Sequence, residues 1–127
     1  MAIRLANKWA TVLRIQPLGD KLSENFFAKD EAGDYRSYTN YTITAVMYDS
    51  FNNLVATPTV AVADGIPPNE TATVTDGKVT ITVNPSDMPT KEGNYVVWAT
   101  ITNDGDADDV ETFVEIDLSL ITKKFRR

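Results

Sequence analysis

Side chains alternate with a period of two along four segments of this sequence, and this pattern constrains the fold more than any other feature. The segments are 40–48, 78–83, 95–102 and 110–120. Successive side chains of a β-strand point to opposite faces, so an apolar residue at every second position marks one buried face. The series expected to face inward are Val79, Ile81, Val83 and Val110, Thr112, Val114, Ile116, Leu118, Leu120. In 40–48 the series Tyr41, Ile43, Ala45, Met47 alternates with Thr42, Thr44, Val46, Tyr48. The segment from Tyr95 to Thr102 is apolar on both faces, so we expect it to be a central strand.

Two further segments are predicted to be strands, each with a proline that limits it. A first strand covers Trp9 to Gln16 and ends at Pro17. A second covers Leu54 to Val62 and contains Pro58. Proline has no main-chain N–H to give to a sheet, so we expect Leu54 to Val62 to be an edge strand or a bulged one.

The remaining segments are less regular. A short strand is predicted from Glu70 to Thr75, and Asp76-Gly77 after it is a typical tight-turn pair. Residues 20–39 are ambiguous, although Phe26-Phe27 could belong to a short strand. A single helical turn is predicted within 84–89.

Composition supports the same fold class. Thr, Val and Ile together account for 36 of the 127 residues, and β-branched residues favour sheet over helix. Several short strands separated by turns every 8–12 residues are typical of a two-sheet sandwich. We therefore predict an all-β, antiparallel, immunoglobulin-like sandwich over 9–121, with an N-terminal arm at 1–8 and a basic C-terminal arm at 122–127.

The sequence lacks the residues on which several kinds of catalysis depend. It has no Cys and no His, which excludes thiolate nucleophiles, disulfides, imidazole bases and the usual zinc and copper sites. The serines have no histidine base and no nucleophile-elbow pattern around them. We expect a protein that is not an enzyme and that uses no cofactor.

One acidic segment resembles a calcium loop in part. Asp104, Asp106 and Asp108 alternate, and Glu115 follows the first of them at the spacing of an EF-hand. The sixth position is Asp109, where that loop needs glycine for its sharp turn, and the flanking segments are strands. These three aspartates are therefore only a weak metal candidate, and a charged hairpin tip is the alternative.

Carboxylates and aromatic residues give two more candidates. The outward face of the last predicted strand carries Glu111, Phe113, Glu115, Asp117 and Ser119. A carboxylate pair on this face would suit glycoside hydrolysis, and a solvent-exposed acidic row is the simpler interpretation. Tyr35 and Tyr38 would form a sugar-stacking platform if both were exposed, whereas Trp98 and Tyr95 are expected to pack in the core.

Charge is distributed unevenly along the chain. The formal net charge is −6, yet both ends are basic and all 18 acidic residues lie between them. Nucleic-acid binding is disfavoured because the acidic body would repel phosphate, and a solvated tail is one alternative. We expect the ends to contact other protein subunits instead. The partner-binding candidates are Arg4, Lys8, Lys123, Lys124, Phe125, Arg126 and Arg127.

The block from Tyr41 to Ile121 resembles the immunoglobulin-like domains of bacteriophage virion proteins. The phrases that carry the resemblance are Tyr41 to Ser50, Asp76 to Val83, and Gly93 to Gly105 with its glycine, aromatic strand and acidic-glycine turn. The last of these is similar to the N-terminal domain of phage baseplate upper proteins. Such proteins usually continue into a fibre or receptor-binding part, whereas this sequence stops at Arg127.

The resemblance implies a capsid decoration (cement) protein or a tail or baseplate accessory, located in the virion after synthesis in the host cytoplasm. Its partners would be major capsid or tail subunits and further copies of itself, with no role for nucleic acid or membrane. No secretory signal is recognisable in residues 1–9 and no apolar run reaches the length of a membrane helix. The alternative function is a carbohydrate-binding or adhesion module.

Overall fold

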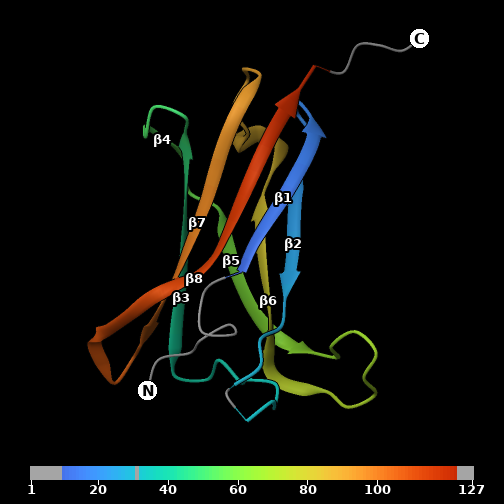
Figure 1. Cartoon of the computed structure of the whole chain (residues 1–127), viewed down its shortest axis with the longest axis vertical. Coiled ribbons are helices and arrows are strands. Elements are labelled where there is room, and N and C mark those ends of the chain that lie inside the picture. Colours follow the sequence, from blue (N-terminus) through green and yellow to red (C-terminus); the bar gives the residue numbers. More distant parts are fainter. Residues whose placement is uncertain (1–9, 31, 123–127) are drawn as a thin grey trace.

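Eight strands and one 3-10 turn make up the computed structural model, which describes residues 10–30 and 32–122 (Figure 1). The strands are β1 (Ala10–Pro17), β2 (Leu22–Phe26), β3 (Tyr41–Asp49), β4 (Leu54–Ala56), β5 (Thr59–Gly65), β6 (Val74–Val83), β7 (Gly93–Asn103) and β8 (Asp106–Ile121). The short turn η1 (Pro85–Asp87) confirms the predicted helical turn.

The strands form two sheets that face each other. One sheet has the order β1-β8-β7-β3-β4 and the other the order β2-β6-β5. This is the immunoglobulin-like arrangement, in which the last two strands lie beside the third strand and the second, fifth and sixth strands form the opposite sheet. The all-β two-sheet sandwich is confirmed, and β7 occupies the central position predicted for it.

β1 and β8 depart from the antiparallel expectation because they pair in parallel, from Ala10 opposite Val114 to Pro17 opposite Ile121. After Pro17 the chain turns at Gly19, whose φ is 84°, and continues as β2 in the other sheet. β1 and β2 therefore cannot form a hairpin, and β1 extends the edge of the first sheet beside the last strand.

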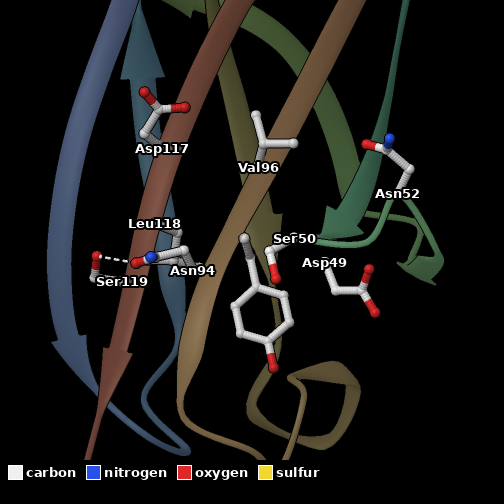
Figure 2. A pocket seen from close by; sticks show the side chains of 9 residues that line it. Asp49, Ser50, Asn52, Asn94, Val96, Asp117, Leu118 and Ser119 are labelled. Carbon is white, nitrogen blue, oxygen red and sulfur yellow. Dashed lines mark hydrogen bonds between the residues drawn. The ribbon is translucent and has the colours of Figure 1, made fainter.

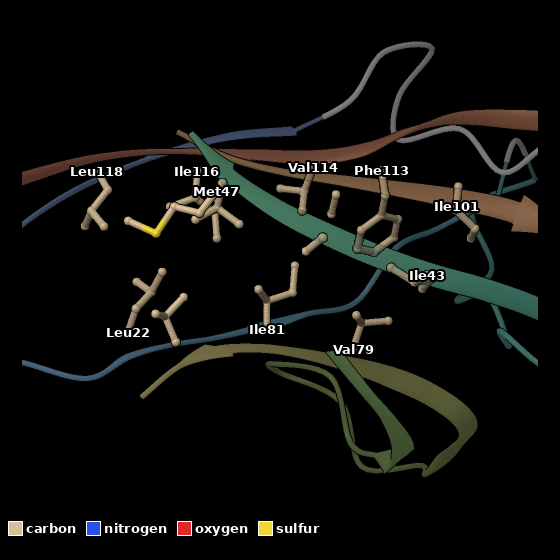
Figure 3. Packing of buried hydrophobic residues seen from close by; sticks show 14 of the residues in the cluster. Leu22, Ile43, Met47, Val79, Ile81, Ile101, Phe113, Val114, Ile116 and Leu118 are labelled. Atoms are coloured by element: carbon tan, nitrogen blue, oxygen red, sulfur yellow. The ribbon is translucent and has the colours of Figure 1, made fainter. Parts of the chain in front are cut away.

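The predicted alternation of side chains produces the core. Val79, Ile81 and Val83 from one sheet lie opposite Val97, Ala99, Ile101 and their neighbours from the other, and all are buried. Figure 3 shows Leu22, Val79 and Ile81 facing Met47, Val114 and Ile116 across the gap between the sheets.

The predicted strand from Leu54 to Val62 proved to be two strands in different sheets. β4 ends at Ala56 beside β3, whereas β5 begins at Thr59 beside β6. Pro58 lies between them, where the chain crosses from one sheet to the other. Because proline cannot donate to a ladder, it lies in the crossing rather than inside one strand.

The predicted turn at Asp76-Gly77 was also wrong, because β6 continues through both residues. Ala63 of β5 pairs with Lys78 of β6, and Gly65 pairs with Val74. One residue of β5 therefore lies opposite three residues of β6, so β6 bulges here. Asp76 has a φ of 49°, and its N–H donates to Asp64 Oδ1 at 2.9 Å. A side chain at Gly77 would collide with Val74. The Asp-Gly pair therefore builds a bulge in place of a turn.

A second bulge changes which residues of β8 face inward. Ala99 pairs with Val114 and Thr100 with Thr112, which leaves Phe113 as an extra residue. Phe113 was predicted to face outward, yet its ring is buried. It packs edge-on against the rings of Tyr38 and Phe26, with distances between ring centroids of 5.6 Å and 6.1 Å. Before the bulge the faces are reversed, so Val110 is half exposed instead of buried.

An ion pair joins the two sheets at their β1 and β2 edges. Arg14 Nε lies 2.9 Å from Glu24 Oε2. Both side chains stand on the side of their sheet that faces the other sheet, since their pairing partners are Leu118 and Ile81.

Replacing Phe113 by alanine should be strongly destabilising. Removal of a buried aromatic ring typically costs about 3–5 kcal/mol, because the transfer free energy is lost and a cavity remains. Urea denaturation of Phe113→Ala should show this loss in the free energy of unfolding. Phe51→Ala is the matched control: Phe51 is 84% exposed, so a change within about 0.5 kcal/mol is expected. Equal effects of the two substitutions would contradict the inward position of Phe113.

Tyr38 should make the protein sensitive to alkali. Burial raises the pKa of Tyr38 well above its usual value of 10, and the weaker effects of Arg36 and the Ala28 main chain oppose this. The unfolded state therefore loses this proton at lower pH than the folded state does, so stability is complete below pH 10 and falls as the pH rises beyond it.

The Tyr38→Phe variant should lose this alkaline sensitivity and unfold at neutral pH much as the original chain does, because the Tyr38 hydroxyl makes no hydrogen bond of good geometry within the described residues. Urea denaturation between about pH 8 and 11 measures the difference around the usual tyrosine pKa. The control Tyr48→Phe retains Tyr38 and should keep the alkaline loss. A steep alkaline loss that survives in Tyr38→Phe would refute the assignment.

Candidate functional site

The outer face of the five-stranded sheet carries an apolar row beside an acidic one. In the parallel pairing, Val12 and Gln16 of β1 lie on the core side with Ile116 and Leu120. The alternate residues therefore face outward. These outward pairs are Thr11 with Glu115, Leu13 with Asp117, Ile15 with Ser119 and Pro17 with Ile121.

Three apolar side chains of this face are open to solvent. Leu13 is 75% exposed, Ile15 74% and Ile121 44%. We call these three residues, together with Glu115 and Asp117, the β1 edge surface. The residues of this surface come from β1 and β8, and β1 is the edge strand of the sheet.

In the second half of β1, polar side chains lie on the core side and apolar side chains lie on the solvent side. Gln16 is 6% exposed, and its side-chain amide donates to the Asp20 carbonyl at 3.0 Å. Arg14 on the same side pairs with Glu24, whereas the apolar Leu13 and Ile15 face water. In a sheet with one face buried, a strand ordinarily turns its apolar side chains to the core and its polar side chains to water. The apolar residues of the β1 edge surface thus stay exposed among the described residues.

A shallow pocket of about 400 Å³ lies further along this sheet, where β3 ends (Figure 2). Ser119 Oγ donates to Asn94 Oδ1 at 2.8 Å within it. Its lining residues are Asp49, Ser50, Asn52, Asn94, Tyr95, Val96, Asp117, Leu118 and Ser119.

Asp49, one of the two carboxylates in this pocket, is occupied by its own turn. Its Oδ1 accepts the main-chain N–H of Asn53 at 2.9 Å and of Phe51 at 2.8 Å, and its Oδ2 accepts the Asn53 side-chain amide at 3.2 Å. The bond from the Asn53 main chain is the largest cause that lowers the pKa of Asp49. A general acid needs a raised pKa, so Asp49 is not suited to donate the proton that glycoside hydrolysis requires.

The acidic candidates from the sequence do not share one face. Glu111 pairs with the inward-facing Ile101, whereas Glu115 and Asp117 point outward. The bulge at Phe113 lies between them and reverses the face. The prediction of one carboxylate row from Glu111 to Asp117 was therefore wrong.

The weak metal candidate Asp104, Asp106 and Asp108 is not brought together. Thr42 Oγ1 donates to Asp104 at 2.6 Å, while Asp106 accepts the main-chain N–H of Asp108 at 3.1 Å. Within residues 10–30 and 32–122, no group of three or more acidic side chains is placed to hold a metal ion. The carboxylates stabilise the hairpin tip instead.

The aromatic platform is not formed either. Tyr38 is 2% exposed and belongs to the core, so it cannot stack on a sugar with the half-buried Tyr35. Trp98 was predicted to pack in the core, but it alternates with the buried Val97 and Ala99 and lies half-buried on the outer face.

The predicted partner-binding residues lie outside the described residues. These are Arg4, Lys8, Lys123, Lys124, Phe125, Arg126 and Arg127. The described part of the chain adds Leu13 and Ile15, which sequence reasoning missed as surface residues. Their alternation with Arg14 and Gln16 was visible, but it gave no sign that the fold would turn the apolar side outward.

The chain matches no known protein-family model and no curated protein. Among solved structures it is similar to a family 123 glycoside hydrolase from Clostridium perfringens, with 13% identity and a TM-score of 0.49. The match covers 88% of this chain and 23% of that one, so the chain spans less than a quarter of the enzyme's length. At this level the similarity does not bear on activity. The part of the chain that the structure describes includes no helix long and apolar enough to cross a membrane.

Asp49 should titrate below its usual pKa of 3.8, because its carboxylate accepts hydrogen bonds that the protonated form would lose. Carboxyl chemical shifts followed by NMR against pH would measure the midpoint, and the amide signals of Phe51 and Asn53 should move with it. This carboxylate stabilises the β3–β4 turn above the usual pKa and stops doing so as the pH falls through the lowered one. Asn53→Ala should move the midpoint back toward 3.8 by removing one bond, and a midpoint at or above 3.8 in the unmodified chain would contradict the geometry.

Proposed function

We propose that this chain is a non-enzymatic structural protein of a bacteriophage particle, either a capsid decoration protein or a tail or baseplate accessory. It binds neighbouring subunits through the outer face of its five-stranded sheet and through its basic ends. The support from sequence is the resemblance of Tyr41 to Ile121 to immunoglobulin-like virion domains. The observation that carries the proposal is the exposed apolar row of Leu13 and Ile15 on an edge strand.

An exposed apolar edge strand is unusual, because the unpaired N–H and C=O groups along a sheet edge can pair with another chain. Soluble proteins protect such edges with charged residues, prolines, bulges or very short strands. Full burial of an aliphatic side chain contributes about 1.5–3 kcal/mol, so Leu13 and Ile15 would stabilise a contact substantially. Glu115 and Asp117 beside them would orient a basic partner and speed its approach.

Other functions are less well supported by this surface. The carbohydrate-binding alternative depended on exposure of Tyr35 and Tyr38 together, and Tyr38 is buried. Nucleic acid would meet Glu115 and Asp117 on the same face, and like charges repel at this range. A subunit-binding surface accounts for both the apolar row and the acidic one.

Particle association tests this proposal. An epitope-tagged chain produced in the source host while it makes phage should band with purified particles in a density gradient. The Ile15→Asp variant should be bound at least about ten-fold less, since it removes one buried aliphatic group and places a charge in the contact. Leu54→Asp is the control, because Leu54 is 59% exposed on the strand at the other edge of the same sheet. Recovery of the tagged chain entirely apart from particles would refute the proposal.

A further inference from the structure

We propose that residues 123–127 of a second copy of this chain bind along the open edge of β1 as an added strand. The inference rests on the proposed function and names one partner for the β1 edge surface. The contact would be head-to-tail, with the edge of one copy receiving the segment of the next.

The outer edge of β1 is open among the described residues. One edge of β1 pairs with β8 from Ala10 to Pro17, and the other has no strand beside it among the described residues. Its unpaired main-chain groups are a template for an extended segment, as in β-strand addition. Pro17 has no N–H, and alternate N–H groups of the strand point toward β8, so every second residue between Ala10 and Gln16 would provide a donor.

Residues 123–127 are complementary to this edge in composition. The segment reads Lys123, Lys124, Phe125, Arg126, Arg127 and contains no acidic residue. In an extended strand Lys123, Phe125 and Arg127 share one face. Phe125 on that face would cover Leu13 and Ile15, which are 75% and 74% exposed.

One of the two flanking cations then lies level with the acidic row. Glu115 lies beside Thr11 and Asp117 beside Leu13 on the outer face. With Phe125 at the centre, a cation stands on either side of it in both strand directions. Long Lys and Arg side chains reach across a neighbouring strand, so with Phe125 beside Ile15 the cation level with Leu13 can approach Asp117.

The distance that the chain would have to cover requires the segment to come from a second copy. Thr122 follows the pair Pro17–Ile121, which places it level with residue 18. For Phe125 to lie beside Ile15 on the open edge, the chain would travel about 10 Å across two strand spacings and about 10 Å back along the strand. The direct path is therefore about 14 Å. Three residues span at most about 11 Å, so the segment cannot reach this position on its own sandwich.

A contact between two different surfaces of identical chains is heterologous, and it extends into rings or open filaments according to the rotation between copies. Two variants that each lack one half of the contact should therefore complement each other. This property gives the test its specificity.

Sedimentation velocity of the purified full-length chain, up to about 1 mM, tests the contact, since even millimolar affinity is then measurable. We expect concentration-dependent self-association that added salt weakens. Ile15→Asp loses the edge surface and Phe125→Asp loses the inserted residue, so each alone should associate at least ten-fold more weakly. An equimolar mixture of the two should form a complex of one copy of each and no larger species.

Leu54→Asp is the matched control, because it places the same charge at the opposite edge of the same sheet. Its association should equal that of the original chain. Thermal melts of all three variants check that they fold, and if Ile15→Asp melts abnormally it is replaced by Leu13→Asp, which tests the same surface. A monomeric original chain, or a mixture that does not associate, would overturn this inference.

The two proposals can fail separately. If the chain bands with particles and Ile15→Asp does not, while the purified chain stays monomeric, the surface binds a different subunit and this inference is wrong. If the purified chain associates as described but never bands with particles, the virion role is wrong and the contact between copies stands.

Discussion

The pairing of β1 with β8 is the constraint on which the surface of this protein depends. Its register brings Gln16 and Arg14 to the core side and turns Leu13 and Ile15 outward. A slip by one residue would reverse every side chain of β1. The polar residues are accommodated where they lie, because Gln16 binds the Asp20 carbonyl and Arg14 pairs with Glu24 across the sheets. The inward polar groups therefore hold the register that exposes the apolar ones.

The bulge in β8 has a comparable effect on the acidic residues. Phe113 is the extra residue, and its ring packs edge-on against Tyr38 and Phe26. Its insertion separates Glu111, on the core side, from Glu115 and Asp117, on the outer side. Packing in the core thus decides that two carboxylates, and not three, stand beside the exposed row of β1. The electrostatic character of the surface follows from an aromatic contact inside the sandwich.

The sequence predicted the central part of this fold well and its irregular parts poorly. Alternation in 40–48, 78–83 and 95–102 identified strands, and in 78–83 it also identified the buried face, because that face is set by the residues themselves. The bulges at Asp76 and Phe113 depend on the partner strand, which local patterns do not reveal. Pro58 indicated an interruption but not that the chain changes sheet. At the site, the acidic residues were recognisable, whereas the outward position of Leu13 and Ile15 depends on a pairing with residues a hundred positions later.

The four sheet edges differ in how they are protected, and this difference points to β1 as the interacting one. β4 has three residues, too few to template a long partner. The β5 edge follows Pro58 and ends at the bulge opposite Asp64. The β2 edge is polar, because its outward residues are Ser23 and Asn25. β1 combines eight residues in regular register with two exposed aliphatic side chains. Protection by shortness, bulging or polarity thus applies to three edges, and an edge left apolar beside acidic groups fits a partner that is itself apolar and basic.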